Sequence, residues 1–114
     1  MHLHVLVEIA GSGLRSVIEQ RIERALGPFS DRISWVSACL QQVKVSSDSR
    51  IHECYIEAVL TTASVLEVEA RAVGAEAAVY QAVERITRRV KAELECMQAA
   101  QERANKPPLP PIKV

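Results

Sequence analysis

Residues 33–72 read ISWVSACLQQVKV, SSDS, RIHECYIEAVL, TTA and SVLEVEARA, and this stretch decides the fold. Apolar and polar residues alternate, many of the apolar ones are β-branched, and two short polar segments interrupt the pattern, which predicts three strands. The expected strands are Ile33–Val45, Ile51–Leu60 and Ser64–Ala72. Because the links between them are short, neighbouring strands are expected to run antiparallel, as a meander.

The last two of these strands each have one apolar face, so one side of the sheet is expected to cover a core and the other to meet water. The predicted core face carries Cys54, Ile56, Ala58, Leu60, Leu66, Val68 and Ala70. The opposite face is acidic and carries Glu53, Tyr55, Glu57, Val59, Glu67 and Glu69.

The flanking segments add one strand and two helices. Residues His2–Ile9 alternate like a half-buried strand, and Leu14–Leu26 places apolar residues at helical spacing. Ala75–Ala104 is a second amphipathic helix, about 45 Å long at 1.5 Å per residue, so its end is expected to project beyond a small sheet. The order β-α-β-β-β-α predicts an α+β two-layer sandwich in which both helices cover one face of a four-stranded sheet.

The composition is that of one soluble globular domain, with 114 residues, 48% hydrophobic and 25% charged. We expect residues 1–104 to form this domain and the proline-rich residues 105–114 to form a flexible tail. No apolar run approaches the ~18 residues that cross a bilayer, and no signal peptide is recognisable, so no membrane partner is expected. Three cysteines without CxxC spacing favour the reducing cytoplasm.

Three stretches resemble, in order and spacing, the ribosome hibernation promoting factor family, which includes the ribosome-associated inhibitor and the sigma-54 modulation proteins. Residues 14–24, LRSVIEQRIER, look like its first helix, with a leucine-arginine start and a "glutamate-x-arginine-leucine" centre. Residues 29–33, FSDRI, are similar to its "phenylalanine-aspartate-arginine-isoleucine" entry to the second strand, with one extra residue. Residues 75–83, AEAAVYQAV, resemble the opening of its last helix. The resemblance covers about residues 3–98.

The resemblance implies a fold similar to double-stranded RNA-binding domains. It also implies a partner, the small ribosomal subunit, whose channel for messenger and transfer RNA such proteins occupy, blocking translation and preserving idle ribosomes under stress. The implied mechanism is occlusion rather than catalysis, with no cofactor and no small-molecule substrate. Because Lys plus Arg equals Asp plus Glu, at 14 each, binding to rRNA would depend on a local basic patch.

Two helical stretches supply candidate RNA-binding residues. Residues 85–91 contain four basic side chains and no acidic one, and three of the four are spaced to share a helical flank. Two arginines of the first helix, and Arg89 in the last, match basic positions of the family. The candidates are Arg21, Arg24, Arg85, Arg88, Arg89 and Lys91. The alternative is an ordinary solvated helix face with pairs such as Glu84–Arg88.

The chain also departs from the family. Where the family continues its last helix with arginine, glutamine, leucine and further lysines, this chain has Ala92, Glu93 and Glu95, and its net charge is zero rather than basic. An alternative function is therefore a protein–protein interaction module, of which a homodimer is one form, that keeps the fold and binds through the acidic sheet face or the sheet edge.

Other constellations point to less specific chemistry. His2, His4, His52 and Glu8 match no structural zinc spacing, so no metal site is predicted. No Ser/His/Asp or Cys/His arrangement has supporting motif context, so the chain is not expected to be an enzyme. The sequence leaves open whether two aromatic residues pack within the protein or bind bases. Trp35 and Tyr55 would stack on bases if exposed, but a packing role is favoured for Trp35, and Tyr80 is expected to pack near the sheet edge.

Overall fold

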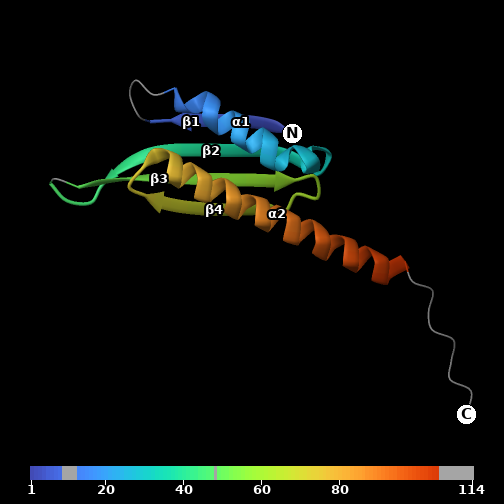
Figure 1. Cartoon of the computed structure of the whole chain (residues 1–114). Helices are drawn as coiled ribbons and strands as arrows, with labels where there is room; N and C mark the ends of the chain where they lie inside the picture. The colour runs from blue at the N-terminus through green and yellow to red at the C-terminus, as the bar shows by residue number, and fades with distance from the viewer. Residues whose placement is uncertain (9–12, 48, 106–114) are drawn as a thin grey trace, which may run out of the picture.

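The computed structural model describes residues 1–8, 13–47 and 49–105 and shows two helices lying on one face of a four-stranded sheet (Figure 1). The elements in chain order are β1 (His2–Val7), α1 (Leu14–Leu26), a 3-10 helix (Gly27–Arg32), β2 (Ile33–Lys44), β3 (Arg50–Leu60), β4 (Val65–Ala72) and α2 (Ala75–Asn105). The predicted α+β two-layer sandwich is confirmed. Predictions for Ile9 and for the proline-rich residues 106–114 lie outside the described residues.

The sheet has the strand order β1-β2-β3-β4. The last three strands form the predicted antiparallel meander. β1 instead pairs in parallel with β2, and α1 makes the crossover that a parallel pair requires. Both helices therefore lie on the same side of the sheet, and its other face carries no element of the described chain (Figure 1).

The core lies between the sheet and the two helices. Alternate residues of β3 point inward, and the predicted core positions Cys54, Ile56, Ala58 and Leu60 are all at most 1% exposed. The helices contribute apolar residues at helical spacing to the same core. The almost fully buried ones include Ile18 and Ile22 from α1 and Val79, Ile86 and Val90 from α2. No polar or charged side chain of the described residues is buried with them.

A register shift at the start of β2 turns Trp35 to the opposite face of the sheet. Ile33 pairs with Leu60 but Trp35 pairs with Val59, so the two residues do not share a face although they are two apart. Ile33 is 2% exposed and Trp35 is 42% exposed. The expectation that Trp35 packs on the same face as Ile33 is therefore wrong.

Helix α2 is longer than the sheet that supports it, as predicted. It passes the β3–β4 turn at Met97, whose Sδ lies 3.9 Å from the Thr62 hydroxyl oxygen. Beyond that point it extends past the sheet (Figure 1). Neither helix in the described part of the chain has both the length and the apolar composition that crossing a bilayer requires.

Truncating the centre of the core should be costly. Ile56 is fully buried on a central strand, so Ile56→Ala should lower the free energy of unfolding by about 2–5 kcal/mol. Val73→Ala, at a position 79% exposed after β4, should change it by less than about 0.5 kcal/mol. Urea denaturation measures both. Equal effects of the two substitutions would contradict the assigned core.

The β3–β4 turn offers a stabilising substitution. Ala63 has a φ of 72°, in the left-handed region that costs an alanine about 1–2 kcal/mol. Ala63→Gly should raise the free energy of unfolding by about 0.5–1 kcal/mol, because the extra freedom of glycine in the unfolded chain offsets only part of that strain. The same change at exposed Ala77 in α2 should lower it by about 1 kcal/mol. Thermal unfolding measures both variants, and a change of the midpoint temperature in the same direction for both would refute the prediction.

Candidate nucleic-acid interface

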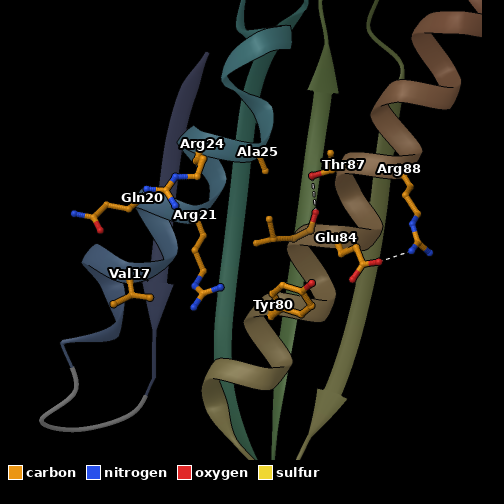
Figure 2. A pocket seen from close by; sticks show the side chains of 10 residues that line it. Val17, Gln20, Arg21, Arg24, Ala25, Tyr80, Glu84, Thr87 and Arg88 are labelled. Carbon is orange, nitrogen blue, oxygen red and sulfur yellow. Dashed lines mark hydrogen bonds and ion pairs between the residues drawn. The ribbon is translucent and has the colours of Figure 1, made fainter.

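A groove of about 620 Å³ runs between α1 and α2 on the outer side of the helix layer (Figure 2). Its apolar lining comes from Val17 and Ala25 of α1 and from Val83 of α2. Its polar lining comes from Gln20, Arg21, Arg24, Tyr80, Glu84, Thr87 and Arg88. The groove exists because the helices bury their apolar stripes against the sheet, which leaves their upper flanks facing each other across open space.

Arg21 and Arg24 supply the uncommitted positive charge of this groove. They are three residues apart on α1, so they lie on one flank of the helix. Arg21 is half-buried and reaches toward the ring of Tyr80, whereas Arg24 is exposed (Figure 2). Neither forms an ion pair within the described part of the chain, whereas Arg15 of α1 and Arg88 of α2 each pair with a glutamate. Two unpaired guanidinium groups beside an apolar floor suit an anionic ligand.

Two basic residues of α2, Arg88 and Arg85, have partners within the protein. Arg88 forms an ion pair with Glu84, one helical turn earlier, as anticipated for a solvated helix face. Arg85 donates a hydrogen bond of 2.6 Å to the backbone carbonyl of Glu69 on the edge strand β4. That contact satisfies an edge carbonyl that would otherwise be open to pairing with another strand. Arg85 therefore helps to hold α2 against the edge of the sheet, besides contributing positive charge to the surface.

Five of the six predicted residues line one or both of two hollows. Arg21, Arg24 and Arg88 line the groove, whereas Arg85 and Arg89 lie with Arg88 around a smaller hollow beside β4. Lys91 is exposed one turn further along α2 and lines neither. Arg88 lines both hollows, so the basic side chains follow one path across the top of the helix layer.

Tyr80 is the residue whose place the sequence did not reveal. It is 58% exposed and lines the groove, so the expectation that it packs near the sheet edge is wrong. It lies on the flank of α2 that faces α1 (Figure 2). The groove beside it forms only because α1 packs next to α2. Its sequence signal is that it stands at the tyrosine position of the family-like helix opening, AEAAVYQAV, which does not reveal what its ring faces.

The outer face of the sheet has the opposite charge. Glu57 and Glu67 lie directly opposite each other on β3 and β4, and Arg71 forms ion pairs with Glu53 and Glu69 at 2.8 and 3.0 Å. Like charges in direct opposition are unfavourable, and they would also repel phosphate. Partial burial and the nearby carboxylates of Glu67 and Glu57 raise the pKa of Tyr55 on this face to about 12.

Trp35 stands at the β1 side of this face between two histidines. The ring centroids of His2 and His4 each lie 6.3 Å from the Trp35 ring. His52 is elsewhere, paired with Gln42 near the far end of β2, and its Nδ1 lies 2.8 Å from the Val73 carbonyl oxygen. Among the described residues, no three His, Cys, Asp or Glu side chains gather closely enough to hold a metal ion.

Comparison with known proteins shows what this architecture is similar to. A ribosomal subunit interface protein from Coxiella burnetii superposes with a TM-score of 0.60 and 19% identity, over 87% of this chain and 99% of that one. The N-terminal domain of Protein Y from Thermus thermophilus gives a TM-score of 0.60 and 19% identity, over 81% of this chain and 98% of that one. No model of a known protein family matches the chain, and no curated protein matches it significantly in sequence.

These two structures bear out the family resemblance at the level of the fold. Each is covered almost completely, so the shared part is the whole β-α-β-β-β-α unit and not a fragment of it. At this level of identity the likeness establishes the fold, and the binding activity has to be argued from the side chains of this chain.

The outer face predicts an unusual tyrosine titration. In a Tyr80→Phe variant, Tyr55 is the only tyrosine left, and it should stay protonated at pH ~10, where half of an ordinary tyrosine ionises. Because the pKa is raised in the folded state, the stability linked to it is present below pH ~10 and lost as the pH rises toward 12.

Ultraviolet absorbance of the tyrosinate, with circular dichroism recorded in parallel, measures this titration. Adding Glu67→Gln should lower the pKa of Tyr55, because it removes a carboxylate that stabilises the protonated phenol. Half-ionisation of Tyr55 at pH ~10 in the folded protein would contradict the described face.

Proposed function

We propose that the protein is a ribosome-associated factor of the hibernation type, which binds rRNA of the small ribosomal subunit through its helix layer. The observation that carries the proposal is the path of basic side chains across α1 and α2, centred on Arg21 and Arg24, which form no ion pair with any residue that the structure describes. The fold shared with a ribosomal subunit interface protein and with a Protein Y domain supports it. The expected setting is translation arrest in the cytoplasm under stress.

Zero net charge is compatible with this role because the two layers differ in charge. The helix layer presents the six candidate residues, Arg21, Arg24, Arg85, Arg88, Arg89 and Lys91. The outer sheet face presents four glutamates, of which Arg71 neutralises part. Near RNA such a molecule is oriented by its own field, with the helix layer toward the phosphates and the sheet away from them.

The proposed mechanism is occupancy rather than catalysis. Guanidinium groups neutralise rRNA phosphates and release counterions, while the rigid sandwich fills space that messenger or transfer RNA would use. The contact is expected to end near Lys91, because Glu93 and Glu95 follow on the projecting part of α2. The departures from the family at Ala92, Glu93 and Glu95 would then shorten the RNA-binding surface without removing it.

Charge reversal tests the proposal. Wild-type protein should sediment with small subunits through a sucrose cushion at low salt and be released as salt rises. The double variant Arg21→Glu, Arg24→Glu should bind more weakly, with a salt slope smaller by about 1–2, roughly one unit for each lost phosphate contact.

The matched control is Lys44→Glu, Arg50→Glu, which makes the same change in net charge at a cross-strand pair of β2 and β3, at the end of the hairpin. It should retain the wild-type slope. If both double variants lose binding equally, net charge and not the helix layer governs association. If wild-type protein does not sediment at low salt, the proposal fails.

A second function is favoured by the exposed apolar side chains of the outer sheet face. Leu6 and Trp35 are 47% and 42% exposed there, beside the glutamates. This arrangement suits a protein–protein module, and a homodimer is one form of it. Light scattering discriminates the two functions, because a dimer formed through apolar contacts persists at high salt whereas RNA binding does not. A monomer at all salt concentrations would count against the homodimer.

A further inference from the structure

We propose that the groove between α1 and α2 holds one unpaired nucleotide of an RNA strand, with its base on the Tyr80 ring and its phosphate at Arg21 and Arg24. This inference rests on the proposed function and names the RNA element that the helix layer would take. It assigns a binding role to Tyr80, whose exposed ring is not part of the buried core.

The exposure of Tyr80 is the first observation. A tyrosine on an amphipathic helix normally buries its ring, yet this ring is 58% exposed and borders the groove. Figure 2 shows the Arg21 guanidinium on the Tyr80 side of the facing helix, so an aromatic ring and a cation line the same groove. Aromatic and guanidinium planes are the two surfaces on which proteins stack unpaired bases.

The shape and lining of the groove agree with one nucleotide. Its volume of about 620 Å³ lies within the range of about 300–1,000 Å³ that is usual for small-ligand sites. The floor is apolar, formed by Val17, Ala25 and Val83, and can receive the flat face of a base.

The charge distribution sets the direction in which the nucleotide lies. Arg21 and Arg24 are on the α1 side, whereas Glu84, already paired with Arg88, is on the α2 side. A phosphate is therefore attracted more strongly to Arg21 and Arg24 on α1 than to the neutralised Glu84–Arg88 pair on α2, and the base is left beside Tyr80.

A single strand fits this arrangement better than a duplex. In A-form RNA the bases are stacked on one another and their faces are covered, so a ring inside a groove cannot reach them. Loops and ends expose base faces, and stacking on them tolerates any sequence because every base has such a face.

Fluorescence anisotropy tests the inference with three ligands, namely a short labelled single-stranded RNA, the same strand annealed to its complement, and unlabelled adenosine monophosphate as competitor. Tyr80→Ala keeps a good helix former but removes the ring, and should weaken single-strand binding about 5- to 100-fold with the salt slope unchanged. Tyr80→Phe keeps the ring and should bind as wild type. Arg24→Gln should lower the salt slope by about 0.7. Trp35→Ala, which removes an exposed aromatic from the opposite face, is the matched control and should bind as wild type.

Each outcome has a distinct meaning. Wild-type affinity of Tyr80→Ala, or duplex binding as tight as single-strand binding, would overturn the inference. Competition by adenosine monophosphate as effective as that by the strand would also overturn it, since the site would then serve a free nucleotide. Sedimentation of the same variants with small subunits separates this result from the proposed function. If Tyr80→Ala still sediments while Arg21→Glu, Arg24→Glu does not, the ribosomal role stands and only the stacking fails.

Discussion

The burial of two helices on one apolar sheet face is the constraint on which the rest of the molecule depends. Ile18 and Ile22 of α1 and Ile86 and Val90 of α2 have no exposed surface, and Ile56 beneath them has none either. Close packing fixes both helices in rotation as well as in position. Their polar flanks therefore face each other across a groove, and two arginines more than fifty residues from Tyr80 in sequence, Arg21 and Arg24, line the same space as its ring.

The same constraint separates the charges. Because both helices occupy one side, the sheet has a bare face on which the alternation of β3 and β4 places Glu53, Glu57, Glu67 and Glu69. The basic side chains of the helices lie on the other side of the molecule. The zero net charge of the chain therefore says little about what either surface would bind, because charges of one sign are grouped locally on each.

Much of the fold could be predicted, because alternation and helical spacing are local signals. The strand and helix bounds agree within one or two residues wherever the structure describes them, as for β3, which begins at Arg50 rather than Ile51. Trp35 was misplaced because a bulge reverses the faces of a strand without changing its composition. The pairing of β1 with β2 is likewise set by tertiary packing and not by any local pattern.

The candidate site was only partly predictable. The spacing of basic residues along each helix predicts which arginines share a surface, but it does not predict which residues of other elements they contact. Arg85 meets the carbonyl of Glu69 from another element, and Tyr80 lies in a groove that exists only once α1 is in place. Such contacts join elements that are distant in sequence, so they follow only from the folded structure. They distinguish Arg85 and Arg88, which have partners within the protein, from Arg21 and Arg24, which form no ion pair with the described residues.

The most direct test asks which face of the molecule meets rRNA. A photoreactive benzoylphenylalanine would be placed at position 80, in the groove, or at position 35, on the outer sheet face, and each protein irradiated with small ribosomal subunits. Cross-links to rRNA from position 80 and none from position 35 are the predicted result. Cross-links from position 35 with none from position 80 would contradict the account, because the acidic sheet and not the helix layer would then face the ribosome.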